Sequence, residues 1–323
     1  MRFRLVFALS AALAAAGLAG CASRVVTRTD EAVVVKASRG ADAEKLAKRF
    51  LGDRREAWRI ADFNGPIRPG DHVLIPLGDW RPTGVRTDAY QVVPVLAYHR
   101  FEMTGPCKGM VVCAGEFARQ LDYLEREGYH VVPLSDLAAF LKGERQLPQK
   151  AVVLTIDDGW RSTAEIAEPI LRERAYPATL FLYTDFVGAS AAIDWATARN
   201  LDRGGIIDVQ SHSKTHADLT QRRNGETSAA YAKRVEGEMK TPADALTKNL
   251  GAAPFAFSYP YGATDQAISE AAEAAGYDIA LTVRRGPNPA FAHPFVLQRT
   301  MIYGEDDLST FARRLTAAVK MEN

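Results

Sequence analysis

The chain has 323 residues, enough for one large domain and one small one. Its apolar fraction of 47% and charged fraction of 24% are typical of a globular protein with a sizeable core and argue against a disordered chain. A formal net charge of +1, without a long basic or acidic tail, argues against nucleic acid as a partner.

The first 20 residues have the pattern of a secretory signal. A basic start at residues 2–4 is followed by an apolar, alanine-rich run at 5–19, which is short for a membrane span. The following Leu-Ala-Gly-Cys, ending at Cys21, resembles a bacterial lipobox. That resemblance implies cleavage before Cys21 and a diacylglycerol on its sulfur. The alternative is a plain secretory signal that happens to contain a cysteine.

The residue after Cys21 is Ala22 rather than Asp. By similarity to the sorting rules of Gram-negative bacteria, this favours the outer membrane, facing the periplasm. We interpret residues 21–31, which are polar, as a tether.

Residues 32–77 predict a small β-α-α-β domain. A short strand at 33–36 precedes helices at 43–50 and 54–62, and a turn and a strand end the segment near Pro76. This pattern, with its closing Ile-x-Pro-Gly-x-x-x-x-Ile-Pro, resembles a LysM domain. The resemblance implies binding to glycans that contain N-acetylglucosamine. The alternative is a spacer domain without a ligand.

Residues 78–91 are rich in Pro, Gly, Arg and Thr and predict a linker. Two further cysteines, Cys107 and Cys113, follow it. In an exported, oxidising compartment we expect them to form a small disulfide loop. They could instead be metal ligands, but no histidine or second cysteine pair lies near them in the sequence.

From residue 92 to 320 the chain alternates short apolar strands with helices, which predicts an α/β fold with parallel strands and crossover helices. Seven or so such units suggest a closed or nearly closed barrel. The predicted strands are 93–98, 152–156, 178–183, 206–210, 256–259, 279–282 and 296–301. The predicted helices are 114–127, 134–142, 161–174, 195–203, 228–248 and 265–275.

Polar side chains follow several of these strands at the point where each ends. They are His99, the pair Asp157 and Asp158, then His212, and the run 258–262. In such barrels the carboxyl ends of the strands form the active-site mouth. We therefore expect these residues to converge.

The residue types indicate a metal centre. His212 and His216 are four residues apart, so a helical turn or tight loop can aim both rings in one direction. Two imidazoles and one carboxylate make three ligands, as in catalytic zinc sites. The second carboxylate would then serve as a base.

Three ordered motifs resemble those of the NodB-type polysaccharide deacetylases (carbohydrate esterase family 4). They are Thr-Ile-Asp-Asp-Gly at 155–159, Ser-His-Ser-Lys-Thr-His at 211–216 and Phe-Ser-Tyr-Pro-Tyr-Gly at 257–262. The resemblance covers about residues 92–315. The opening run Val-Pro-Val-Leu-Ala-Tyr-His at 93–99 is similar to the start of the subgroup that includes poly-N-acetylglucosamine deacetylases. The resemblance to the family as a whole implies a deformed (β/α)7-type barrel and a divalent metal, usually Zn²⁺.

The resemblance also implies residue roles. Asp157 would be the general base, and Asp158, His212 and His216 would bind the metal. The backbone N–H of Tyr261 would stabilise an oxyanion, and Tyr261 would also contact the substrate.

The sequence departs from the family's motifs in two places. Many members have an arginine where Ser258 stands, and we expect Arg299 on the last strand to take its place beside the base, the alternative being an ordinary surface arginine. No clean match exists for the histidine that supplies the general acid, so His293 and His99 are both candidates. Trp195 could line the sugar site or could be a core residue at a helix start.

The leading hypothesis is a lipid-anchored, metal-dependent N-deacetylase acting on peptidoglycan or a polymer like poly-N-acetylglucosamine. One alternative keeps the enzyme but makes the bond an O-acetyl ester on xylan or a similar glycan. The other is a non-catalytic glycan-binding lipoprotein. The LysM-like segment favours N-acetylated glycans.

Overall fold

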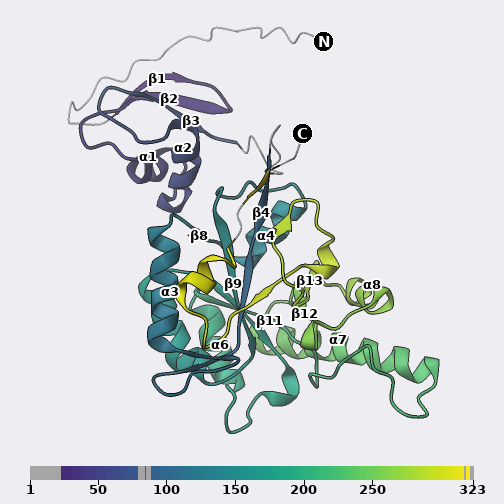
Figure 1. The fold of residues 1–323 in the computed structure, drawn as a ribbon. Coiled ribbons are helices and arrows are strands. Elements are labelled where there is room, and N and C mark those ends of the chain that lie inside the picture. Colours follow the sequence, from purple (N-terminus) through teal and green to yellow (C-terminus); the bar gives the residue numbers. More distant parts are fainter. Residues whose placement is uncertain (1–22, 79–83, 85–88, 316–317, 321–323) are drawn as a thin grey trace. The chain divides into compact units, whose positions relative to one another are not determined.

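The structure is a computed structural model that describes residues 23–78, 84, 89–315 and 318–320. The chain divides into two compact units, Met1–Gly78 and Asp79–Asn323 (Figure 1). The predicted signal segment and Cys21 lie outside the described residues. Each unit is considered by itself.

The small unit contains a three-stranded antiparallel sheet, β1–β2–β3, and two helices. Val33 and Val35 on β2 face Leu46 and Ile60 on the helices, which form its core with Val73 and Ile75 on β3. The elements are β1 Arg24–Arg28, β2 Ala32–Lys36, α1 Ala43–Phe50, η1 Arg54–Glu56, α2 Ala57–Asn64 and β3 His72–Pro76.

The predicted β-α-α-β order is present, but the small unit has one strand more. Arg24–Arg28 lies where the sequence predicted part of a tether, and it pairs with β2 as strand β1. All of its residues are exposed. Because the strand buries neither face, it lacks the alternation of apolar and polar residues by which a half-buried strand is recognised.

The large unit is built on seven parallel strands in the order β13–β12–β11–β10–β9–β5–β15, with β8 paired to β9 as an eighth strand. The order follows the chain except that β15 lies beside β5. The strands are β5 Val95–Tyr98, β8 His130–Val131, β9 Ala151–Asp158, β10 Ala178–Leu182, β11 Ile207–Ser211, β12 Ala256–Ser258, β13 Ile279–Leu281 and β15 Thr300–Met301.

The sheet curls because Leu297–Met301 approaches both of its edges. Leu297 bridges to Leu281 of β13, and Thr300 and Met301 pair with β5. The sequence predicted a single strand over 296–301. Instead, Val296 ends a 3₁₀ turn, η5 Pro294–Val296, Leu297 makes a single bridge, and regular strand pairing is confined to Thr300 and Met301. Proline lacks the N–H that a strand ladder needs, so pairing begins beyond it.

Helices pack outside the strands (Figure 1). A large cluster of buried apolar side chains fills the space between helices and sheet, with Leu121 and Leu124 of α3 and Leu201 of α6 among them. The helical elements are α3 Ala114–Arg126, α4 Leu134–Leu141, η2 Thr163–Ala167, α5 Glu168–Glu173, η3 Thr184–Phe186, α6 Trp195–Arg203, α7 Ser228–Leu250, η4 Pro260–Gly262, α8 Gln266–Ala274 and α9 Leu308–Ala312. In the described part of the chain, none of the helices has the length and apolar character to cross a membrane.

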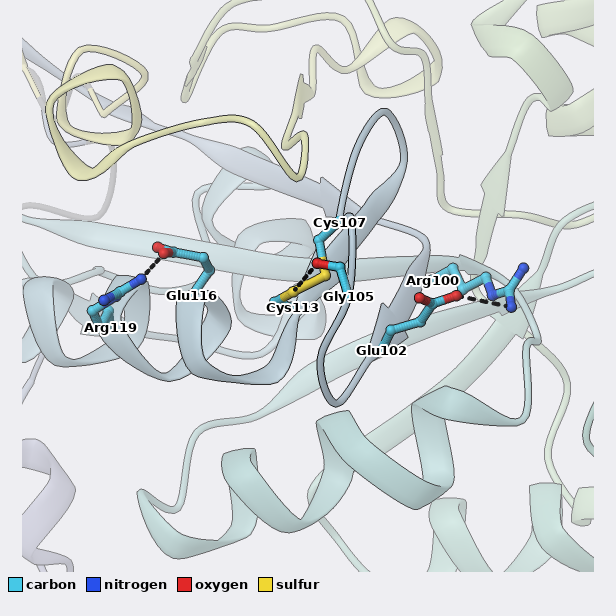
Figure 2. Close-up of a disulfide and its surroundings, with 7 residues drawn as sticks. All are labelled: Arg100, Glu102, Gly105, Cys107, Cys113, Glu116 and Arg119. Atoms are coloured by element: carbon cyan, nitrogen blue, oxygen red, sulfur yellow. Dashed lines mark hydrogen bonds and ion pairs between the residues drawn. A yellow bond between two sulfur atoms is a disulfide. The ribbon is translucent and has the colours of Figure 1, made fainter.

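Short strands outside the barrel complete the unit. They are β4 Ala89–Val93, β6 Arg100–Glu102, β7 Val111–Cys113, β14 Asn288–Pro289 and β16 Ala318–Lys320. Cys107 and Cys113 form the disulfide that the sequence predicted, with their Cα atoms 5.5 Å apart (Figure 2). Cys113 ends β7, which pairs with β6, so the disulfide closes the loop between these two strands.

Candidate active site

Three side chains with metal-binding atoms converge at the carboxyl ends of β9 and β11. Asp158 ends β9, and His212 and His216 follow β11. Their ligand atoms all lie within 4.8 Å of one another. Nε2 of His216 lies 3.4 Å from Oδ1 of Asp158, and Nε2 of His212 lies 3.7 Å from the same oxygen. One carboxylate and two imidazoles that face a common space fit a divalent cation such as Zn²⁺.

Two neighbouring groups fix which atoms of this set face the common space. Nδ1 of His212 lies 2.7 Å from the carbonyl oxygen of Ser258, which leaves Nε2 for a ligand. The indole N–H of Trp160 donates to Oδ2 of Asp158 at 2.9 Å, which leaves Oδ1 toward the imidazoles. Burial lowers the pKa of His212 to about 4, so its ring is neutral at neutral pH, the form that binds metals.

The backbone around these residues is strained. The described residues include five non-glycine residues with positive φ, and four of them belong to this region: Asp158, Ser213, His216 and Tyr261. Such conformations persist only where the surrounding structure holds them, and they are frequent at functional sites. At Gly159, with φ of 97°, a Cβ would lie 2.2 Å from a methyl carbon of Leu182, so only glycine fits after the two carboxylates.

The loop that carries His216 is held by a buried carboxylate from helix α7. Glu238 is 4% exposed and accepts the backbone N–H groups of Lys214 and Thr215 at 3.1 and 2.9 Å. It also accepts the hydroxyl of Thr215 at 2.7 Å. Because these bonds satisfy both of its oxygens, Glu238 fixes the path of the loop between the two histidines.

Asp157 forms a fully buried ion pair with Arg299. Nη1 and Nη2 of Arg299 donate to Oδ1 and Oδ2 of Asp157 at 2.7 and 2.8 Å. The guanidinium also donates to the hydroxyls of Thr155 and Ser258 and, through Nε, to the carbonyl of Thr282. All five N–H donors of the arginine therefore have acceptors, which is what an arginine with 0% exposure requires.

The ion pair decides the charge of Asp157. Burial by itself would raise the pKa of this carboxyl, but Arg299, and after it His212 and His99, outweigh burial and hold the pKa below its ordinary value. Asp157 is thus an ionised carboxylate inside the protein, with proton-accepting oxygens beside the three-ligand group.

His99 faces the same carboxylate from β5's carboxyl end. Its Nε2 lies 3.9 Å from Oδ2 of Asp157, the distance that also separates Nε2 of His212 from this oxygen. The His99 ring is 9% exposed, and its Nδ1 is buried without a hydrogen-bond partner among the described residues. A buried imidazole with an unused nitrogen is available to carry a proton.

Residues 144–280, which include both carboxylates and both metal-ligand histidines, match the family profile described as polysaccharide deacetylase. Over these residues the chain is similar to the polysaccharide deacetylases.

Curated relatives show the same similarity. YxkH of Bacillus subtilis, named for the same family, is 22% identical over 218 residues, which cover 68% of this chain and 74% of YxkH. The poly-β-1,6-N-acetyl-D-glucosamine N-deacetylase of Escherichia coli K12 is 24% identical over 240 residues. That match covers 64% of this chain but only 36% of the E. coli enzyme.

The fold matches solved deacetylases as well. The deacetylase PplD of Streptococcus pyogenes, solved with acetate, superposes with a TM-score of 0.63 at 23% identity. The superposition covers 70% of this chain and 98% of PplD. The curled parallel sheet is therefore the NodB-type deacetylase fold that the sequence predicted.

Tyr261 lies beside His216. Its ring is 65% exposed and stands edge-on to His216, with centroids 4.8 Å apart. Its backbone is left-handed, with φ of 60°, between Pro260 and Gly262 of η4. This conformation positions the Tyr261 backbone at the edge of the site.

Two predicted site residues are not part of this group. Nδ1 of His293 accepts the N–H of Phe295 and caps η5, ahead of the strand that carries Arg299. His293 therefore caps a turn in this structure, and its role as a catalytic candidate remains a prediction. Trp195 begins α6 and is partly buried against the large apolar cluster between helices and sheet, which favours the core interpretation over the sugar-binding one.

Sequence reasoning missed Trp160 and Glu238. Trp160 follows the Asp-Asp-Gly motif directly, and its distance of two residues from Asp158 was a signal that a side-chain contact was within reach. Glu238 gave no such signal, because it lies more than 20 residues beyond the loop that it holds.

Proposed function

We propose that the chain is a metal-dependent polysaccharide N-deacetylase that removes acetyl groups from N-acetylglucosamine-type units. The observation that carries the proposal is the ionised, buried pair of Asp157 and Arg299 beside Asp158, His212 and His216. The name of the E. coli relative supports an N-acetylglucosamine polymer as substrate.

In this proposal Asp158, His212 and His216 hold Zn²⁺, because two imidazoles and a carboxylate are ligands that zinc prefers. The bound cation would act as a Lewis acid toward the acetamide oxygen and as a site for water. Trp160 and the carbonyl of Ser258 keep the ligand atoms aimed at it.

Asp157 acts as the general base. It removes a proton from water as the water oxygen attacks the carbonyl carbon of the acetamide. Arg299 keeps Asp157 ionised and fixes both of its oxygens, so the base is ready before the substrate arrives. The backbone N–H of Tyr261 donates to the carbonyl oxygen as negative charge develops on it.

His99 is the general acid in this proposal. Its ring lies beside Asp157, and its unpartnered Nδ1 and its Nε2 allow it to carry a proton. When the C–N bond breaks, His99 protonates the leaving nitrogen. The products are acetate and a free amine, so one water is consumed for each acetyl group released.

The test is hydrolysis of defined polymers. The purified protein with Zn²⁺ should release acetate and an equal amount of new free amines from poly-β-1,6-N-acetylglucosamine or from peptidoglycan. Acetylated xylan serves as the comparison substrate. Acetate release from xylan alone would replace the N-deacetylase proposal by the O-acetyl esterase, and no release from any of the three would contradict enzymatic function.

We also propose that the protein is exported and anchored by a lipid on Cys21, in the outer membrane facing the periplasm. The basic start, the short apolar run and the lipobox-like ending support this. The Cys21→Ala variant should move from the membrane fraction to the soluble fraction on cell fractionation, and an unchanged distribution would contradict lipid anchoring.

For residues 32–77 we propose a LysM-like glycan-binding role, supported by the strand and helix order and the closing motif. The full chain should sediment with insoluble peptidoglycan or chitin even when Asp157 is replaced by Asn. Equal sedimentation by a chain that lacks residues 32–77 would identify this segment as a spacer.

A further inference from the structure

A cleft of about 400 Å³ lies beside the candidate active site, between β6 and η2. Trp160 belongs to both places: its ring lines the cleft, while its N–H donates to Asp158. The volume is within the range of about 300–1,000 Å³ that is usual for small-molecule sites. A molecule in the cleft is therefore separated by one side chain, that of Trp160, from the group formed by Asp158, His212 and His216, here called the metal-ligand group.

The charges that line the cleft cancel. Arg100 and Arg161 contribute two positive charges, and Glu102 and Glu165 contribute two negative ones. Arg100 pairs with Glu102 at 3.1 Å, and its guanidinium lies 5.4 Å from the centre of the Trp160 ring. A balanced lining favours neither an anion nor a cation.

The donors and acceptors of the cleft instead suit a polyhydroxylated ring. Guanidinium groups donate, carboxylates accept, and hydroxyls such as that of Thr104 do both. Sugar hydroxyls donate and accept as well, and aromatic side chains such as Trp160 supply apolar area beside them. The chemical class that matches is a neutral pyranose.

One wall of the cleft is held by the disulfide loop. Glu102 pairs with Cys113 in the β6–β7 ladder, and Figure 2 shows Glu102 and Arg100 next to the disulfide. The same loop is fixed at its far side, where Gly109 accepts the N–H of Gly304 at 2.9 Å. The wall is thus formed before a ligand arrives.

We propose that this cleft binds the neutral sugar unit next to the one whose acetyl group is removed. The proposal rests on the proposed function and adds to it that substrate chain length matters through this cleft. A single sugar would reach only the metal-ligand group, whereas a longer chain would also place a unit between β6 and η2.

The test fills the cleft without removing any of its polar groups. Ala191 lines the cleft and is exposed, so Ala191→Trp should block it while the protein stays folded. Ala189, in the same loop and also exposed, is not among the residues that line the cleft, so Ala189→Trp is the matched control. Acetate release is measured on β-1,6-linked N-acetylglucosamine oligomers of one to five units.

For the longest oligomer we expect kcat/KM of Ala191→Trp to fall by about tenfold, the effect of about 1.4 kcal/mol of lost binding. For the shortest oligomer that is hydrolysed, kcat/KM of Ala191→Trp should equal kcat/KM of the wild type. Ala189→Trp should have the wild-type kcat/KM at every oligomer length. An equal loss at all lengths, or no loss at any length, would overturn the proposal.

Two further measurements separate the possible failures. If the wild type hydrolyses neither the oligomers nor any of the polymers, the proposed function fails. Calorimetric binding of the five-unit oligomer to Ala191→Trp and to Ala189→Trp then decides the role of the cleft by itself. Binding lost only in Ala191→Trp would support the cleft, and equal binding would refute it. If Glu165→Gln weakens binding of de-acetylated oligomers alone, the cleft selects an ammonium group and the neutral-sugar assignment is wrong.

Discussion

Two aspartates on the strands of the barrel show how a partner, rather than burial alone, decides the charge of a carboxyl. Asp157, near the end of β9, has Arg299 on both of its oxygens, and its pKa lies below the ordinary value. Asp208, near the start of β11, has only the neutral amide of Gln210 on its oxygens. Burial, with a smaller contribution from Asp202, raises its pKa to about 6.

The two ends of the barrel differ in the groups that surround the carboxyl. Asp208 lies near the start of β11 and His212 follows its end, four residues later, so about 13 Å separates them along the strand. Over that distance the surroundings change from neutral hydrogen-bond donors to a guanidinium and imidazoles. Both carboxyls are ionised at neutral pH, but only Asp157, at the end where Arg299 reaches across the barrel, stays ionised at acidic pH.

The largest effect is expected from removing the charge of the base. Asp157→Asn should lower the rate of acetate release by about 10²–10⁴-fold, because the amide cannot accept the proton. The metal content, measured by mass spectrometry of the purified protein, should be unchanged. Loss of metal in this variant would show that Asp157, rather than Asp158, is the ligand.

The next largest effect is expected from removing the positive charge of Arg299, which should lower the stability of the protein. Arg299→Met leaves Asp157 buried and unpaired, and we expect the free energy of unfolding to fall by about 3–5 kcal/mol in urea titrations. The double variant Asp157→Asn, Arg299→Met should recover much of that stability, since it removes both charges. If the double variant is no more stable than Arg299→Met alone, the loss comes from packing and not from the unpaired carboxylate.

A smaller effect is expected at the second carboxylate of the mouth. Trp160→Phe keeps the ring but removes the N–H that holds Oδ2 of Asp158. Affinity for Zn²⁺, measured by competition with a chelating dye, should fall by about 10–100-fold, as is usual when a group behind a ligand is lost. Phe186→Leu, which changes a ring packed against Trp160 without touching this bond, is the control.

The smallest effect concerns stability at the opposite end. The unfolded chain releases the Asp208 proton near pH 3.8, whereas the folded protein keeps it up to about pH 6. The folded state therefore loses stability relative to the unfolded state as the pH rises through this interval. Asp208→Asn should be more stable than the wild type at pH 8 by at most about 3 kcal/mol.

At pH 2.5 that difference should vanish, because the wild-type carboxyl is then almost entirely neutral in both states. The measurement is a pair of urea titrations at the two pH values. A constant difference at both would mean that hydrogen bonding, and not ionisation, separates the two proteins.

Much of the fold could be predicted from the sequence because it follows from local patterns. Apolar runs end in polar residues at the seven barrel strands, and helical periodicity marks the crossover helices, so their positions agree within a few residues. Most of the elements that escaped prediction were exposed or very short, whereas β4 Ala89–Val93, whose start was predicted as the end of the linker, is partly buried. Strand β1 buries no residue, and β6 and β7 have three residues each, too few for a pattern to repeat.

The candidate ligand set could be predicted from local motifs, because Asp158, His212 and His216 sit in motifs whose spacing carries their chemistry, and their ligand atoms lie together in the structure. The distant residues that complete the site could be identified only from the folded chain. Arg299 lies 142 residues from Asp157, and nothing local distinguishes it from a surface arginine. Curling of the sheet brings the last strand near the base, whereas the cap at η5 keeps His293 in a local turn. Such contacts depend on the closure of the sheet, a property of the whole chain that no short segment encodes.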